Sequence, residues 1–145
     1  CTDKTFGTGH SGIAVFTSTR PHRVLYGFDD ADPPDNAGRL IALLFKHVAV
    51  ICCYSPSIGA LDNPHRNEHR LHFDQRLALH AAALRASMPL ILCNDFNVAH
   101  TDSDCPDDPL PAPICLASRS LAERDGFTEI LSSSRTKDCH PTVPG

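Results

Sequence analysis

One short stretch in the second half of the chain, Pro89–His100, limits the folds that this sequence can adopt. It begins with a helix-breaking proline, continues through the apolar run Leu90–Cys93 and then turns polar at Asn94–Asn97. A short apolar run between breakers predicts a buried β-strand. Alternate residues of a strand project to the same side, so Asp95 and Asn97 should face the same way at its C-terminal end. In enzymes built on sheets, ligands commonly bind at that end.

An acid and an amide two positions apart are also common in turns, where both side chains cap local backbone groups. For Asp95 and Asn97 alone, the turn is favoured over a ligand site. The rest of the chain has to decide between the two interpretations.

Length and composition are those of one ordinary folded domain over residues 1–145, with 41% hydrophobic and 21% charged residues. No apolar run is long enough to span a bilayer and no signal-peptide pattern opens the chain, so no membrane partner is expected. The formal net charge of -4 does not suit a protein that grips nucleic acid by bulk charge. Phosphate chemistry would therefore need a metal ion or local basic residues.

The cysteines favour a reduced protein. There are seven, an odd number, and none forms a C-x-x-C pair that would support a zinc site. Three lie in apolar strand-like runs, where free thiols behave as small apolar side chains. A secreted disulfide framework is the weaker alternative, and an intracellular location is expected.

Hydrophobic patterns predict four further strands, all before this stretch in the sequence. Strands are expected at Ile13–Phe16 and His22–Phe28, paired as a hairpin, and at Gly38–Phe45 and Val48–Tyr54, joined by a tight turn at Lys46-His47. The last two runs are apolar on both faces, which indicates central strands.

Two helices are also expected. Asn63-Pro64 has the form of an N-cap followed by a first-turn proline, and apolar residues then recur at steps of three or four to about Ser87. The charged residues on its other face, among them Arg70, are interpreted as solvated. Ser120 and Glu123 have the spacing of a capping box for a shorter helix. This order of elements predicts an α/β (α+β) fold with a mixed, mostly antiparallel sheet.

Six pieces of the chain together resemble the exonuclease III-type apurinic/apyrimidinic (AP) endonucleases of the endonuclease/exonuclease/phosphatase superfamily. They are Gly9-His10-Ser11-Gly12, Gly38-Arg39-Leu40-Ile41, Tyr54-Ser55-Pro56, Phe73-Asp74, Asn94-Asp95-Phe96-Asn97-Val98-Ala99-His100 and Glu123-Arg124-Asp125-Gly126-Phe127. The last two pieces distinguish the exonuclease III branch from the inositol phosphatases and deadenylases of the superfamily.

The resemblance implies part of a four-layered α/β sandwich and a DNA repair enzyme that uses Mg²⁺ (or Mn²⁺) to cleave DNA 5′ to an abasic site. Asp95 matches the aspartate that activates the attacking water, Asn97 the amide that binds the scissile phosphate, and Tyr54 the tyrosine that lies against it. A carboxylate can accept a proton from water, and an amide N–H can stabilise charge on a phosphoryl oxygen. Asp95 and Asn97 would contribute at most to a second metal position. A monomer is expected.

Three further residues have weaker matches. His10 stands where the family usually has an aromatic residue that touches the DNA backbone, and a loop histidine without a role is an equal alternative. Asp104 matches an acid that supports the active-site network, or is a solvated loop acid. For His100 a hydrogen-bonded structural role is favoured, and Arg39 and Glu123 are also assigned to structure.

The sequence departs from the family pattern at both ends. The only acid before Gly9 is Asp3, where the family has a metal-binding glutamate, and the family's C-terminal Ser-Asp-His is missing around Asp138. A carboxylate cage for Mg²⁺ cannot be completed from the matched positions. The chain is therefore expected to be a central segment of the family domain and inactive alone. Asn94 replaces a glycine, and the turn is expected to survive because Asn tolerates positive φ.

Three hypotheses follow. The first is an AP endonuclease, located in the nucleus of a eukaryote or otherwise in the cytoplasm. The second is a catalytically dead or truncated remnant with at most weak nucleic-acid binding. The third is another phosphodiesterase of the superfamily, such as a retroelement endonuclease, or a phosphatase.

Overall fold

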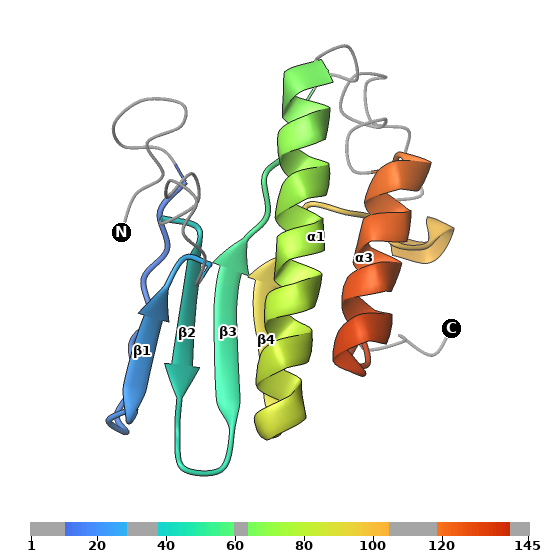
Figure 1. Cartoon of the computed structure of the whole chain (residues 1–145). Coiled ribbons are helices and arrows are strands. Elements are labelled where there is room, and N and C mark those ends of the chain that lie inside the picture. The colour runs from blue at the N-terminus through green and yellow to red at the C-terminus, as the bar shows by residue number, and fades with distance from the viewer. Residues whose placement is uncertain (1–10, 29–37, 60–63, 105–118, 140–145) are drawn as a thin grey trace.

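The computed structural model of the protein describes residues 11–28, 38–59, 64–104 and 119–139. The elements follow in the order β1 (Arg23–Tyr26), β2 (Leu40–Leu44), β3 (Ala49–Tyr54), α1 (Pro64–Ser87), β4 (Leu90–Asp95), the 3₁₀ turn η1 (Asp102–Asp104) and α3 (Leu121–Ser134) (Figure 1). Within these residues, no helix has the length and apolar character needed to cross a membrane.

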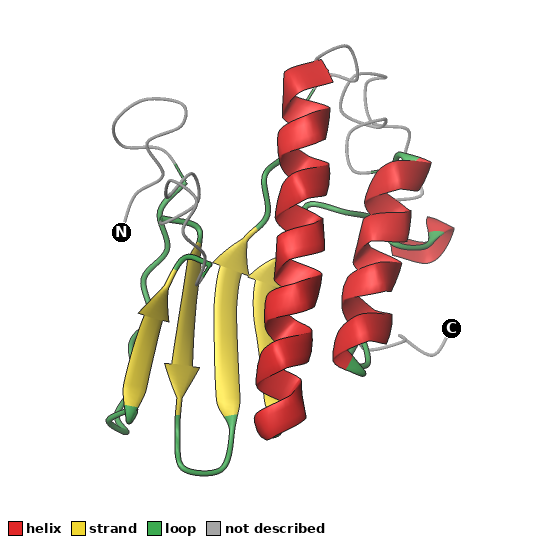
Figure 2. Ribbon diagram, in the orientation of Figure 1, coloured by secondary structure: helices red, strands yellow, loops and turns green. Residues whose placement is uncertain are grey.

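The strands form one mixed sheet in the order β1-β2-β3-β4 (Figure 2). The β1–β2 and β2–β3 pairs are antiparallel and the β3–β4 pair is parallel. Lys46 and His47 make the predicted tight turn, which the Phe45 N–H closes by donating to the Val48 carbonyl at 2.9 Å. A parallel pair requires a long crossover, and α1 provides it between β3 and β4. The predicted small α/β unit with a mixed, mostly antiparallel sheet is confirmed.

Two predictions about the strands were wrong. Residues 13–16 form no strand. The Ile13 N–H donates a backbone hydrogen bond of 3.2 Å to the carbonyl of Gly38, which lies just before β2. The strand after them, β1, pairs instead with β2. This pairing is favourable because β2 is the most deeply buried strand, with Leu40–Leu43 all buried. β4 was predicted to be a buried strand, but it lies at an edge of the described sheet, none of its residues is buried, and Ile91 is 50% exposed.

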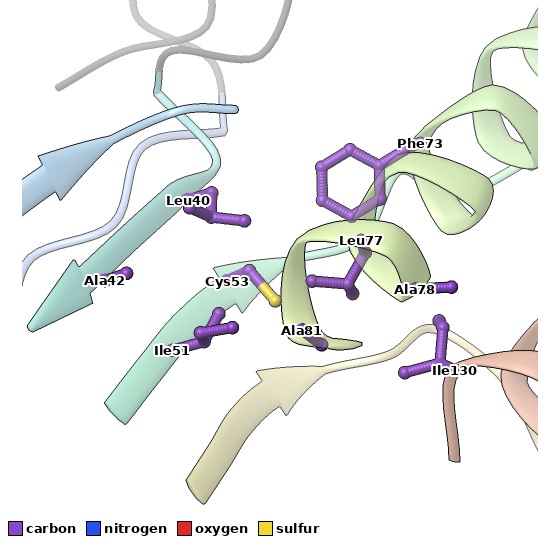
Figure 3. Close-up of a cluster of buried hydrophobic side chains, with 9 residues drawn as sticks. All are labelled: Leu40, Ala42, Ile51, Cys53, Phe73, Leu77, Ala78, Ala81 and Ile130. Carbon is purple, nitrogen blue, oxygen red and sulfur yellow. The ribbon is translucent and has the colours of Figure 1, made fainter. Parts of the chain in front are cut away.

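The core lies between the sheet and α1, with α3 beside α1 (Figures 1 and 3). Its members point toward one another from four elements: Leu40, Ala42, Ile51, Cys53, Phe73, Leu77, Ala78, Ala81 and Ile130. The spacing of four between Phe73, Leu77 and Ala81 places them on one helix face, as predicted. Each large apolar side chain buried in this way contributes about 1.5–3 kcal/mol.

The predicted end of α1 near Ser87 and the predicted capping box of α3 are confirmed. α1 runs over Pro64–Ser87, while its predicted N-cap Asn63 lies outside the described residues. Ser120 and Glu123 form the reciprocal capping box at the start of α3. At its other end Arg135 adopts the left-handed conformation, and its N–H donates to the Leu131 and Ser132 carbonyls.

Candidate functional site

The C-terminal ends of β3 and β4 place two of the predicted site residues side by side. The register pairs Tyr54 with Asp95 as the last residues of the two parallel strands. Cys53 and Ile51 face α1, so the alternation of a strand puts Tyr54 on the opposite face, next to Asp95. The Asp95 side chain is exposed, and Tyr54 is half-buried.

The turn interpretation of Asp95 and Asn97 holds, and it does not exclude a site. Asp95 Oδ1 accepts a hydrogen bond from the Asn97 backbone N–H at 3.0 Å, as in ordinary turn chemistry. Within the described part of the chain this is the only hydrogen bond to that carboxylate. One carboxylate oxygen is therefore left for a ligand.

Asn97 is fixed in both backbone and side chain. Its φ of 47° lies in the left-handed region, which Asn tolerates better than most residues. Its Nδ2 donates to the Ser55 carbonyl at 2.8 Å. Since a carbonyl can only accept, this bond sets the orientation of the amide and leaves one N–H on Nδ2 for another acceptor.

Ser55 joins the two strand ends from a fully buried position. Its N–H donates to the Asp95 carbonyl at 3.0 Å, and its Oγ accepts from Asn94 Nδ2 at 2.9 Å. Asn94 is still in β4 and does not have positive φ, so the turn predicted at Asn94 was misplaced. The left-handed residue is Asn97, because the strand continues through Asp95.

Arg39 holds Tyr54 in place. It is only 4% exposed, donates from Nη1 to the Tyr54 carbonyl at 3.2 Å, and its guanidinium carbon lies 5.3 Å from the centre of the Tyr54 ring. A guanidinium over an aromatic face is an attractive arrangement. The structural role assigned to Arg39 agrees with these contacts.

A buried charge cluster, made of Arg70, Asp74 and Glu123, lies behind the site. Arg70 Nε donates to Asp74 Oδ2 at 2.7 Å, and its Nη1 is 3.6 Å from Glu123 Oε1. Burial raises the pKa of Asp74 to about 6, because desolvation outweighs the opposing effect of Arg70 and Glu123 adds repulsion.

The interpretation of Arg70 as solvated was wrong, since it is 0% exposed. Its position three residues before Phe73 and seven before Leu77 continues the buried stripe of α1, and that spacing could have revealed it.

Asp95 and Asn97 open onto a groove of about 1280 Å³ that runs along β4 toward the end of α3. His100 and Asp104 line the same groove. His100 Nε2 lies 2.9 Å from Thr128 Oγ1 and its ring packs edge-on against Phe127, which agrees with a structural role. Asp104 Oδ2 accepts from the Thr101 N–H at 2.7 Å and from Thr101 Oγ1 at 2.9 Å, so it also stabilises its own turn. His10 lies outside the described residues.

The described residues do not make a complete site for Mg²⁺. In the parts of the chain that the structure describes, no three His, Cys, Asp or Glu side chains cluster to hold a metal ion. Asp95 supplies one exposed carboxylate, while Mg²⁺ is usually bound through one or two carboxylates together with substrate phosphates and waters. Further ligands would have to come from elsewhere.

Comparison with known proteins gives sequence and structural relatives, although no family model matches the chain. The Exodeoxyribonuclease of Bacillus subtilis is 34% identical over 125 residues, which are 86% of this chain and 48% of that protein. The DNA repair nuclease APEX1 of Danio rerio is 30% identical over 94% of this chain and 42% of its own length. The chain thus spans less than half the length of these relatives.

A solved structure of the 3′ phosphatase NExo from Neisseria, bound to a product DNA hairpin, superposes with a TM-score of 0.66 at 29% identity. The superposition covers 78% of this chain and 43% of the Neisseria chain. An AP endonuclease from Archaeoglobus fulgidus has the same fold, with a TM-score of 0.57.

The other five pieces that carried the resemblance meet in space, whereas Gly9 and His10 lie outside the described residues. Tyr54 and Asp95 are neighbours in the sheet, Asp74 and Glu123 share Arg70, and Phe96 packs on Phe127 with ring centres 4.6 Å apart. Together with the relatives in sequence and structure, this arrangement shows that the chain belongs to the exonuclease III-type AP endonuclease family.

Proposed function

We propose that this chain carries the water-activating and phosphate-contacting part of a DNA repair nuclease that cleaves the phosphodiester 5′ to an abasic site. The observation that supports this most is the grouping of Tyr54, Asp95 and Asn97 at the ends of β3 and β4. One Asp95 oxygen and one Asn97 N–H are left for a ligand there. The printed names of the relatives are those of DNA nucleases and AP endonucleases.

In this proposal each residue has a distinct task. Asp95 accepts a proton from the water whose oxygen attacks phosphorus. The bond from phosphorus to the upstream 3′ oxygen breaks, and that oxygen takes a proton from solvent water and leaves as a hydroxyl. The free N–H of Asn97 donates to a phosphoryl oxygen, where negative charge increases in the transition state. The Tyr54 phenol donates to the same phosphate, from a backbone that Arg39 holds. Asp104 and His100 support the loop that follows β4.

Mg²⁺ (or Mn²⁺) is the proposed cofactor, and when bound it would neutralise charge on the phosphate. Because the described residues do not complete its site, its main ligands are proposed to come from family positions that are not matched in this chain. His10 is proposed to contact DNA. The proposed partner is DNA with abasic sites, and the proposed oligomeric state is a monomer. The proposed location is the nucleus in a eukaryote and otherwise the cytoplasm.

The described sheet is proposed to be one half of a four-layered sandwich. Ile91 is 50% exposed and Cys93 is exposed on the face opposite α1, and the half-buried Val50 and Cys52 adjoin them. Such an apolar face is what a second sheet would cover. The half of the relatives' length that this chain does not span is long enough to supply that sheet.

A second candidate function is the removal of 3′ phosphates or 3′-terminal nucleotides from DNA. Solved structures of a Neisseria protein described as a 3′ phosphatase and as a 3′-5′ exonuclease have TM-scores of 0.66 and 0.65 to this chain. The same aspartate and amide could serve all of these phosphoester hydrolyses, which differ in where the DNA is held.

A chimera tests the proposal. The aligned segment of the Bacillus subtilis Exodeoxyribonuclease is replaced by the matching residues of this chain, and the product is incubated with Mg²⁺ and a duplex that contains one abasic analogue. We expect incision 5′ to the analogue and none in the undamaged duplex. Stepwise shortening or 3′-phosphate release that outpaces incision would favour the second candidate. A chimera that melts cooperatively like its parent but cuts nothing would support the remnant hypothesis instead.

A further inference from the structure

We propose that Arg70 is a positioning residue: its buried guanidinium ties together the two loops of the candidate site and thereby sets the place of the Asn97 amide. The first loop follows β3 and contains Ser55 and Pro56. The second loop follows β4 and contains Asn97. That Arg70 supports catalysis rests on the proposed function, whereas its effect on the position of the Asn97 amide does not.

The two loops share one donor. Arg70 Nη1 donates to the Pro56 carbonyl at 3.0 Å and to the Asn97 carbonyl at 3.2 Å. A guanidinium that is 0% exposed has no bulk water as an alternative partner, so losing either bond would be costly. Above this link, Asn97 Nδ2 donates to the Ser55 carbonyl. The position of the Asn97 amide relative to the first loop is therefore fixed both through its backbone and through its side chain.

The guanidinium is itself held by the two helices. Asp74, one turn further along α1, accepts from Nε at 2.7 Å, and Glu123 of α3 faces Nη1 at 3.6 Å. Glu123 is in turn fixed by Ser120, whose Oγ donates to Glu123 Oε2 at 2.9 Å. The arginine thus transmits the packing of α1 and α3 to the ends of the strands.

Lysine cannot replace arginine in this role. The contacts of Arg70 diverge from two different nitrogens of a planar fork, toward a carboxylate on one side and two carbonyls on another. An ammonium group carries the same charge at a single point and lacks this geometry. Arg70→Lys should therefore keep the charge of the cluster and release the loops.

The experiment is NMR spectroscopy of the 145-residue chain labelled with ¹⁵N. It measures no activity, so its result does not depend on whether the chimera cuts DNA. In the wild type we expect the Ser55 backbone N–H, which is buried and donates to the Asp95 carbonyl, to exchange slowly with solvent. We also expect two well-separated signals for the Asn97 Nδ2 protons, one of them hydrogen-bonded. A Ser55 N–H that is unprotected in the wild type would overturn the inference.

In Arg70→Lys we expect exchange at Ser55 to be faster by about tenfold or more, while the β2–β3 amides change little, because only the local opening is affected. The Asn97 Nδ2 signals should move toward those of a free amide. Arg76→Lys is the matched control, because Arg76 lies on the same helix and over the Phe28 ring, 4.8 Å from its centre. If Arg76→Lys reproduces the change at Ser55 and Asn97, or Arg70→Lys leaves both unchanged, the inference fails.

Glu123→Gln provides a milder variant in case Arg70→Lys does not fold. It keeps Arg70 and a side-chain oxygen that can accept the hydrogen bond from the Ser120 N–H. It removes the Glu123 charge, one of the two carboxylate charges beside the guanidinium. We expect the same pattern of change at Ser55 and Asn97 with a smaller size. Full wild-type protection and unmoved Asn97 signals in this variant would contradict the inference as well.

Discussion

Asn97 satisfies two separate requirements, and they can be tested apart. Its backbone is left-handed at φ 47°, which costs an ordinary L-residue about 1–2 kcal/mol. Its side chain donates to the Ser55 carbonyl. Glycine meets the first requirement and fails the second, whereas alanine fails both.

We therefore expect Asn97→Ala to lower the free energy of unfolding more than Asn97→Gly, by roughly 1 kcal/mol. Urea unfolding of the two variants measures the difference. Both variants lose the amide, so neither should support incision in the chimera. An alanine variant as stable as the glycine variant would mean that the backbone at this position is not strained for a side chain.

The Asp74 carboxyl predicts a dependence of stability on pH. Its pKa in the folded protein is about 6 against an ordinary value of 3.8, so folding favours the protonated form. The stability that it contributes is fully present below pH 3.8 and is lost as the pH rises through about 6. At about 1.4 kcal/mol per pKa unit, the whole change is on the order of 3 kcal/mol.

Asp74→Asn lacks this titration and is the reference for it. We expect the unfolding free energy of the wild type, minus that of Asp74→Asn, to fall between pH 4 and pH 7. Urea unfolding at several pH values gives the difference. A difference that rises over this range would show that Arg70 outweighs desolvation and lowers the pKa of Asp74.

At the scale of elements, α1 and α3 approach each other closely where Gly126 faces Asp74. A Cβ at Gly126 would lie 2.9 Å from Asp74 Oδ2 and 3.4 Å from its Cβ. In most helices, replacing an interior glycine with alanine stabilises by about 0.5–1 kcal/mol. Here the added methyl group must push α3 away from the charge cluster.

We expect Gly126→Ala to lower the free energy of unfolding by about 1–3 kcal/mol, the usual cost of overpacking. Asp125→Ala, its exposed neighbour on α3, should change stability by less than about 0.5 kcal/mol. Thermal unfolding of the two variants compares them. A stabilised Gly126→Ala would show that the helices have room to separate.

Local signals predicted most of the elements. Pro64 and the spacing of Phe73, Leu77 and Ala81 predicted α1, and two apolar runs with a two-residue turn predicted the β2–β3 hairpin. The prediction of a strand at Ile13–Phe16 failed because a short apolar run does not show whether a partner strand lies beside it. Pairing of distant strands depends on the whole sheet, which a local pattern does not describe.

The candidate site could be predicted only in part. The spacing of Asp95 and Asn97 predicted a shared direction, but their role at a phosphate and that of Tyr54 came from the resemblance. Arg70 was missed because a charged residue on a helix is usually solvated, and its burial depends on Asp74 and Glu123 from two helices. The contact with Glu123 joins residues far apart in the sequence, which a local pattern does not reveal.

At the scale of the whole molecule, the exposed face of β4 predicts how this chain sits in the longer chimera. If a second sheet covers this face, the Cys93 thiol becomes buried. In the 145-residue chain we expect Cys93 to react readily with a thiol reagent, and in the chimera we expect it to react at least about tenfold more slowly. Cys139, which is exposed at the far end of the described residues, is the control for reagent access. Equal reactivity of Cys93 in both proteins would contradict the sandwich.

Asp95 is central to this account, and its substitution in the chimera is the most direct test. The measurement is the single-turnover rate of abasic-site incision by the chimera with Asp95, Asp95→Asn or Asp104→Asn, at saturating enzyme and Mg²⁺. A positioned general base contributes roughly 10²–10⁴-fold, so Asp95→Asn should slow incision by at least about 100-fold. DNA binding should be retained, and Asp104→Asn should slow incision much less. Incision within a few-fold of the unchanged chimera after Asp95→Asn would show that the water is activated elsewhere and that the strand end of β4 is not the catalytic centre.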